Sequence, residues 1–273
     1  MSGAIDYEVE YNNRARVPEN PALIAGWARD AKAYREANEG RWHVIPYAAG
    51  ARHSIDFFPA DGHGPIAVFI HGGYWQALDS SFFSHLAGGL NAHGISVAIP
   101  NYELCPVVTI DDIIAQTRLA MRELARLGQK LVVSGHSAGG HLAACMLATD
   151  WRAIDPALPE DLVIAAYAIS GLFDLVPLVS TSVNMPLHLN DVSAREVSPL
   201  FWPAPSRGSL DAVVGGDESA EYFRQSRTIV DTWGVTIPTR YQTVSGANHF
   251  TVIAGMADPK SPMTLRLKQL AQA

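Results

Sequence analysis

From Pro65 onward, the sequence alternates between short apolar runs and longer amphipathic stretches. The apolar runs have the length of strands and lie near 66–70, 95–99, 130–134, 163–169, 211–215 and 236–243. Helix-periodic stretches separate them, near 80–93, 110–127, 138–149, 218–233 and 262–271. Thr109 and Ser261 stand where the side chain of each can cap a helix. Such alternation is typical of β-α units, which form a mostly parallel central sheet with helices on both faces.

Two segments depart from this pattern. Residues 1–64 contain a helical pattern and two candidate edge strands, at about 21–38, 43–47 and 52–58. Residues 172–205 are rich in Pro, Ser and Asn and have weak periodicity, as a surface insertion does. We expect residues 1–273 to form one domain, in which 65–273 is the core and the two irregular segments form a small cap over the strand ends.

Charge and cysteine content restrict the setting in which this chain can act. The formal net charge of −7 argues against nucleic-acid and anionic membrane surfaces, which clustered Lys and Arg would have to neutralise. The arginines between Arg14 and Arg41 are typical of a solvated helix face. Cys105 and Cys145 are too few for a disulfide framework, and the first residues lack the basic and apolar parts of a secretory signal. The apolar stretch 162–173 is too short to span a bilayer, so we expect a cytoplasmic protein.

A strand followed by a glycine-rich turn and a helix forms the first chemical motif. Residues 131–140 read LVVSGHSAGG, and the helical run AACMLAT follows shortly after. A serine on such a tight turn needs small neighbours, which Gly135 and Gly139 supply. A phosphate-binding loop would need Lys and Ser or Thr after its last glycine, where the chain continues with His141. We therefore interpret Ser137 as the nucleophile of an α/β-hydrolase fold.

The general base follows by elimination, because this fold orders its catalytic residues as Ser, acid and His. After Ser137, the only histidines are His141, His188 and His249. His141 lies one turn along the helix that starts at the serine, and His188 precedes the acidic residues at the last plausible strand end. His249 lies in a loop between the last strand and the C-terminal helix, which predicts that it is the base.

The third member of the triad should follow a strand. The segment LDAVVGGDES supplies two adjacent candidates, Asp217 and Glu218, and their spacing alone does not separate them. The chosen carboxylate would hold the imidazole in the tautomer that accepts the serine proton and would stabilise the imidazolium that forms.

Backbone donors for an oxyanion are expected after an early strand, where the sequence reads IAVFIHGGYWQ. Glycine permits the dihedral angles that turn N–H groups toward the nucleophile, and one such donor can contribute about 3 kcal/mol to transition-state stabilisation. We expect the N–H of Gly73 or Tyr74 to act together with that of Ala138. Two nearby histidines are interpreted as structural residues that shape their loops, His71 and His136.

With these residues placed, the sequence resembles the kynurenine formamidase (arylformamidase) branch of the α/β hydrolases and its bacterial esterase relatives. The resemblance extends from about Pro65 to the C-terminus. It rests on HGGYW at 71–75, GHSAGG at 135–140, SGLFDLVPL at 170–178, SPL at 198–200, ESAEYFRQS at 218–226 and NHF at 248–250. In that family the fifth motif is similar to Asp-Ser-Pro-Glu-Phe, whose leading Asp is the triad acid. The resemblance therefore favours Glu218 as the acid, with Asp217 as the alternative.

The resemblance also implies a substrate, N-formylkynurenine, whose formyl group would be transferred to Ser137. Five aromatic residues are candidates to line a pocket for its ring, although ordinary core packing is expected for at least half of them: Tyr74, Trp75, Phe173, Trp202 and Phe250. Tyr11 and Asn12 are further candidates to approach the site from the N-terminal cover.

The predicted activity is hydrolysis of a small ester or amide through an acyl-enzyme, with no metal and no organic cofactor. A general carboxylesterase for short alkyl or aryl esters is an alternative with the same chemistry. A binding protein that has the fold but no activity is a second alternative, disfavoured because every triad position is filled. The expected partner is a small molecule rather than a nucleic acid or a membrane, and a homodimer is compatible with the sequence.

Overall fold

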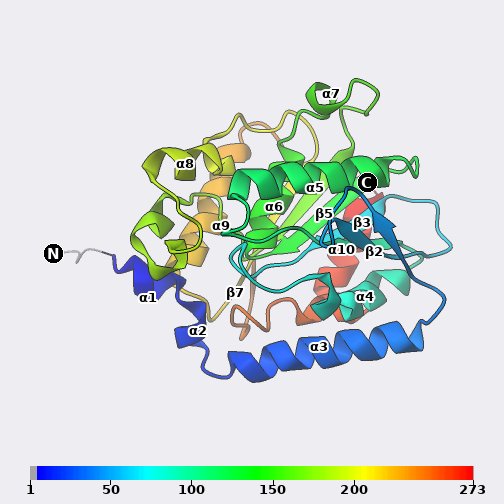
Figure 1. Cartoon of the computed structure of the whole chain (residues 1–273), viewed down its shortest axis with the longest axis horizontal. Coiled ribbons are helices and arrows are strands. Elements are labelled where there is room, and N and C mark those ends of the chain that lie inside the picture. Colours follow the sequence, from blue (N-terminus) through cyan, green and yellow to red (C-terminus); the bar gives the residue numbers. More distant parts are fainter. Residues whose placement is uncertain (1–4, 273) are drawn as a thin grey trace.

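The computed structural model describes residues 5–272, and its centre is an eight-stranded sheet (Figure 1). The strand order is β1-β2-β4-β3-β5-β6-β7-β8. β2 pairs antiparallel with β1 and β4, and every other pair of neighbours is parallel. The strands are β1 (His43–Pro46), β2 (Ser54–Phe58), β3 (Ile66–Ile70), β4 (Val97–Pro100), β5 (Leu131–His136), β6 (Val163–Ile169), β7 (Ser209–Gly215) and β8 (Thr239–Val244). The mostly parallel sheet confirms the prediction from the alternating pattern.

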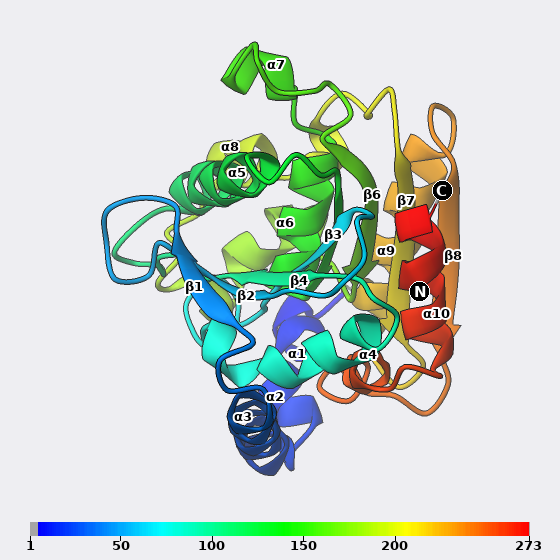
Figure 2. The ribbon, with the colours of Figure 1, turned by 90° about the vertical axis from the view of Figure 1, so that its right-hand side faces the viewer.

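Helices cover both faces of this sheet. α5, α6 and α9 share one buried core with the strands, whereas α4 and α10 pack into the core on the opposite face (Figure 2). The helices are α1 (Tyr7–Tyr11), α2 (Asn13–Arg16), α3 (Asn20–Ala37), α4 (Ala87–Asn91), α5 (Ile110–Ala125), α6 (Ala138–Leu147), α7 (Trp151–Ile154), α8 (Asp191–Glu196), α9 (Ala220–Trp233) and α10 (Pro262–Gln272). The predicted caps are present, because Thr109 forms a capping box with Asp112 and the hydroxyl of Ser261 accepts the N–H of Thr264.

One predicted helix is wrong in extent. The helix expected over 80–93 is divided into two 3₁₀ turns, Ser80–Phe82 and Ser84–Leu86, followed by the short α4. Two glycines within α4 lower its helix propensity. Gly89 also lies so close to the backbone of Met256 that a Cβ atom would stand 2.1 Å from the carbonyl oxygen. This stretch is therefore shaped by close packing against a distant loop rather than by its own periodicity.

The start of the N-terminal segment contacts the 172–205 segment, whereas the rest of residues 1–64 contributes α3 and the strands β1 and β2. The segment 172–205 forms three 3₁₀ turns and α8, with the turns at Val176–Ser180, Ser182–Asn184 and Pro199–Phe201. Its Ser182 donates both its N–H and its hydroxyl to the carboxylate of Glu8 in α1, each at 2.7 Å. α3 follows α1 and α2 and runs along the outside of the molecule (Figure 1). The N-terminal helix α1 and the 172–205 segment, more than 170 positions apart in sequence, are thus joined by hydrogen bonds.

Two further observations concern the whole described chain. Between residues 5 and 272, no helix is both long enough and apolar enough to cross a bilayer. Cys105, in the loop after β4, and Cys145, on α6, are buried and unpaired with one another.

Candidate active site

The turn between β5 and α6 holds Ser137 in an unusual backbone conformation. Its φ of 57° and ψ of −118° lie where a residue with a Cβ atom is rarely found. The turn is tight enough that a Cβ atom on Gly135 would stand 2.0 Å from the carbonyl oxygen of Gly139, and one on Gly139 would stand 1.9 Å from that of Ile70. The small neighbours expected from the sequence are therefore needed at both positions.

This packing predicts opposite outcomes for two glycine-to-alanine substitutions. Gly139→Ala should lower the free energy of unfolding by about 3 kcal/mol or more, because its methyl group meets the backbone of β3. Gly26→Ala, within α3, meets nothing closer than 3.7 Å and should raise the free energy of unfolding by about 0.5–1 kcal/mol. Urea denaturation of both variants checks this, and equal stabilities would contradict the packing described.

An imidazole and a carboxylate form a buried pair beside this turn. His249, in the loop after β8, directs Nδ1 toward Oε2 of Glu218 at 2.7 Å. The other oxygen of that carboxylate accepts the hydroxyl of Ser170 at 2.5 Å and the N–H of Gly215 at 2.7 Å. Asp217 is exposed and forms no hydrogen bond with His249 among the described residues. Of the two candidate acids, the structure brings Glu218 to the histidine.

Ser137 and His249 face one pocket. Both line it, and the ring of His249 packs between the rings of His136 and Tyr222, with each centroid 4.7 Å away. Within residues 5–272 no hydrogen bond joins the hydroxyl of Ser137 to His249. Catalytic hydrogen bonds often close only when substrate is bound, so a direct proton transfer between these two groups stays a prediction.

The loop after β3 passes directly over the serine turn. Gly73 and Tyr74 have φ values of 115° and 51°, and a Cβ atom on Gly72 would stand 3.0 Å from Cβ of Ser137. In the described part of the chain, no protein acceptor takes a hydrogen bond from the N–H of Gly73, Tyr74 or Ala138. These three N–H groups are therefore not used by the described protein, and Gly73 and Tyr74 line the pocket beside Ser137, whereas their role as oxyanion donors stays a prediction.

The other histidines that the sequence places near the motifs are buried within the fold. Nδ1 of His71 lies 2.8 Å from the carbonyl of Gly72, and its ring stacks on Tyr102. His141 contacts the carbonyl of Val197 through Nε2 at 2.6 Å. Burial lowers the pKa of His71 and of His141 to about 4, and it lowers the pKa of His136 well below its ordinary value. His188, by contrast, is exposed on the 172–205 segment.

Buried neutral histidines make stability depend on pH. Burial lowers the pKa of His141 from 6.5 to about 4, so the unfolded chain binds its proton first as the pH falls. The free energy of unfolding should therefore decrease between about pH 6.5 and pH 4, and each such histidine contributes up to about 1.4 kcal/mol per pH unit. His141→Asn should make this slope shallower by that amount, as measured by denaturation at several pH values. An unchanged slope would contradict the assignment of His141 as a neutral buried group.

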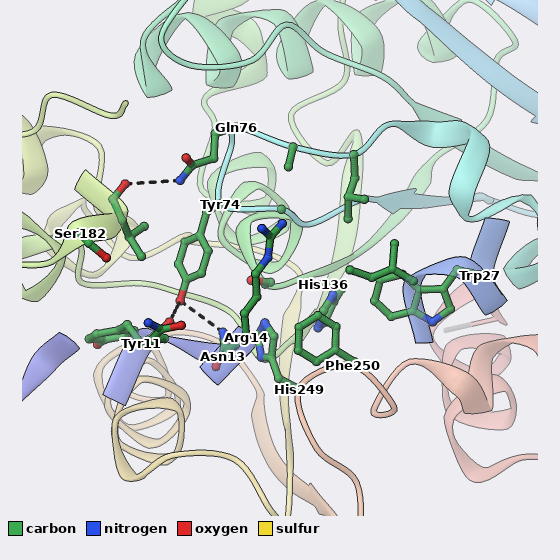
Figure 3. A pocket seen from close by; sticks show the side chains of 17 residues that line it. Tyr11, Asn13, Arg14, Trp27, Tyr74, Gln76, His136, Ser182, His249 and Phe250 are labelled. Carbon is green, nitrogen blue, oxygen red and sulfur yellow. Dashed lines mark hydrogen bonds between the residues drawn. The ribbon is translucent and has the colours of Figure 1, made fainter. Parts of the chain in front are cut away.

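The pocket has a volume of about 360 Å³ and an aromatic side (Figure 3). Tyr74 and Phe250 line it, as the sequence analysis expected. Trp27 of α3, which the sequence analysis did not select, also lines it and stacks on Phe250 with ring centroids 6.0 Å apart. Nothing in the helical pattern of α3 distinguishes this side chain from one that covers the core.

Three of the five aromatic candidates for the pocket wall lie elsewhere, which corrects their assignment as substrate-binding residues and agrees with the expectation that at least half of the five pack within the fold. Trp75 is fully buried and meets the ring of His141 edge-on. Phe173 is also fully buried in the core. Trp202 donates its indole N–H to the carbonyl of Glu196 on the outer side of the 172–205 segment. Packing thus takes all three away from the pocket.

Residues of the N-terminal cover complete the pocket wall. Tyr11 and Asn12 line it, as expected, and so does Asn13. The buried amide of Asn13 donates to the hydroxyl of Tyr222 at 2.7 Å and to that of Tyr74 at 3.3 Å. The two hydroxyl groups lie 2.8 Å apart, and Tyr222 was not identified from the sequence. Because Tyr222 packs against His249, this network connects the N-terminal segment to the imidazole.

Comparisons with known proteins agree with this geometry. A model described as "Alpha/beta hydrolase family" matches residues 67–273. The kynurenine formamidase of Danio rerio is 30% identical over 244 residues, covering 84% of this chain and 82% of the relative. That of Drosophila melanogaster is 28% identical over 273 residues, covering 92% and 90%. The crystal structure of a protein provisionally assigned as a thioesterase, from Silicibacter sp. tm1040, superposes with a TM-score of 0.86 at 33% identity, covering 99% and 100%.

Proposed function

Because this chain belongs to the alpha/beta hydrolase family and is homologous to the kynurenine formamidases, we propose that it hydrolyses a small amide or ester through an acyl-enzyme on Ser137. The observation that supports this most strongly is the pairing of His249 with Glu218 at a pocket that also contains Ser137 on its strained turn. The best candidate substrate is N-formylkynurenine or a similar N-formyl arylamine.

In the proposed reaction, His249 accepts the proton of Ser137 as the hydroxyl oxygen attacks the substrate carbonyl. The N–H groups of Ala138 and of Gly73 or Tyr74 would hold the resulting oxyanion. Collapse breaks the bond to the leaving amine or alcohol, which takes the proton from the imidazolium. A water molecule, deprotonated by the same imidazole, then attacks the acyl group, and Ser137 recovers its proton as the acid leaves.

Glu218 has a positioning role in this proposal. By accepting a hydrogen bond from the N–H at Nδ1, it favours the tautomer of His249 in which Nε2 has no proton and can accept one from the serine. The hydrogen bonds from Ser170 and Gly215 hold the carboxylate in place. The longer side chain of Glu, relative to the Asp of the related motif, reaches the imidazole in this arrangement.

The pocket supports an aryl substrate of modest size. Its volume of about 360 Å³ is near the lower end of the range of about 300–1,000 Å³ for small-molecule sites. Trp27, Phe250 and Tyr74 offer aromatic surface on which the ring of an arylamine could pack.

An ester or thioester substrate is the second candidate, and the similarity to the provisionally assigned thioesterase favours it. Kinetics on N-formylkynurenine and p-nitrophenyl acetate, measured side by side on one preparation, tests the choice. We expect kcat/KM to be higher for N-formylkynurenine. If the ester is cleaved and N-formylkynurenine is not cleaved above background, the formamidase proposal is wrong and the hydrolase proposal stands.

A further inference from the structure

We propose that Arg14 binds a carboxylate of the substrate, so that this pocket selects substrates that carry a carboxylate group. This inference rests on the proposed function and deepens it, because it assigns a substrate class to the same site. Arg14 is exposed on α2, as the expectation of a solvated helix face implies, and it also lines the pocket.

Among residues 5–272, Arg14 is the only residue lining the pocket that has a permanently charged side chain. Seventeen of these described residues line the pocket, and none of the others is Lys, Asp or Glu. In Figure 3 the side chain of Arg14 extends from α2 across the pocket, with its guanidinium group between Tyr74 and His136 in this view. A chain of net charge −7 thus presents a cation at its candidate active site.

The backbone of Arg14 is held on both sides. Its carbonyl accepts the side-chain amide of Asn20 at 3.1 Å, and the preceding Asn13 is anchored to the hydroxyl of Tyr222. Asn12 caps α2 by accepting the N–H of Ala15 at 3.1 Å. The position from which the guanidinium group extends is therefore fixed.

The guanidinium group itself has no protein partner among residues 5–272, in either ion pairs or side-chain hydrogen bonds. The two acids of the preceding helix α1 are engaged elsewhere. Glu8 accepts two hydrogen bonds from Ser182, and Glu10 accepts the N–H of Glu221. All five N–H donors of the guanidinium group thus stay available to a ligand.

The planar guanidinium group of an arginine can donate two parallel hydrogen bonds to the two oxygens of one carboxylate. In the part of the chain that the structure describes, no lining residue offers a carboxylate, which would make a purely cationic substrate unfavourable here. The amide of Gln76 also lines the pocket and could assist in binding an anion. The chemistry of the wall therefore fits a substrate that combines an aryl or acyl group with a carboxylate at some distance from the bond that is cleaved.

The test uses two substrate pairs that differ in one carboxylate. N-formylkynurenine is compared with N-formylkynurenamine, which lacks it, and mono-p-nitrophenyl succinate with p-nitrophenyl butyrate, in which a methyl group replaces it. The variant Arg14→Gln keeps a polar side chain without the charge. Arg16→Gln is the matched control, since Arg16 is an exposed arginine on the same helix that does not line the pocket.

We expect wild type to prefer the carboxylate member of at least one pair. Arg14→Gln should lower kcat/KM for that member by about tenfold to a hundredfold, mainly through KM, and lower it for the member without a carboxylate by less than about threefold. Arg16→Gln should keep the wild-type preference.

Several outcomes would overturn the assignment while leaving the hydrolase proposal intact. These are the absence of a carboxylate preference in both pairs, its persistence in Arg14→Gln, or an equal loss of kcat/KM on substrates with and without a carboxylate. An equal loss would assign Arg14 to the transition state or to the pocket structure instead. If wild type hydrolyses none of the four compounds, the proposed function itself fails.

Discussion

Ser137→Ala should reduce turnover by about 10⁴- to 10⁶-fold, because no other group on the turn between β5 and α6 can form the acyl-enzyme. The residual rate would come from substrate binding and the backbone N–H groups alone. Steady-state kinetics on whichever substrate wild type cleaves gives the first measurement. Labelling with a fluorophosphonate probe gives the second, and it should be lost completely in the variant.

Ser182→Ala is the matched control, since Ser182 also lines the pocket but lies on the 172–205 segment. It should retain probe labelling and most of the activity. Retained labelling in Ser137→Ala would place the nucleophile elsewhere. Failure of the probe to label wild type, together with no hydrolysis of any substrate, would favour the non-catalytic binding protein.

Glu218→Gln should lower kcat by about 10⁴-fold with little change in stability. The amide is nearly the same size and can still accept from Ser170 or Gly215 through its oxygen. Its NH₂ group would then face Nδ1 of His249 and donate to it, which moves the imidazole proton to Nε2. A histidine in that tautomer does not accept the serine proton, so the first chemical step fails.

The neighbouring acid supplies the control for this substitution. Asp217→Asn should leave kcat within about threefold of wild type, because Asp217 is exposed and does not contact His249. Thermal unfolding of both variants separates loss of the fold from loss of the chemistry. A large loss of kcat in Asp217→Asn with a small one in Glu218→Gln would reverse the assignment of the acid.

Local sequence patterns were sufficient for the sheet and for the serine turn. The strands at 66–70 and 163–169 were predicted at the bounds observed, because a buried strand is a short apolar run wherever it lies. The turn at Ser137 was predictable for a similar reason, because the small residues that it requires lie within two positions of the serine, at Gly135 and Gly139. The position of Glu218 relative to His249 was anticipated from the family motif rather than from spacing.

The pocket wall was harder to predict because it depends on contacts between distant segments. Trp75 and Phe173 carry no local signal that distinguishes a core side chain from a pocket side chain, and both are in the core. Trp27, Tyr222 and Arg14 line or support the pocket because α2, α3 and α9 are brought together by tertiary packing. The hydrophobic pattern of a single helix does not predict how that helix packs against the others.

The pocket is lined by residues from two parts of the chain, before and after residue 67, and this has an evolutionary consequence. The family model begins at residue 67, whereas Asn13, Arg14 and Trp27 belong to helices that precede it. Part of the proposed recognition surface is therefore encoded apart from Ser137, Glu218 and His249, although Tyr74 and Phe250 lie within the matched stretch. Mutation or recombination in the part before residue 67 can change which molecules enter the pocket while the serine, the imidazole and the carboxylate stay untouched, so new specificities can arise in this lineage without rebuilding its chemistry.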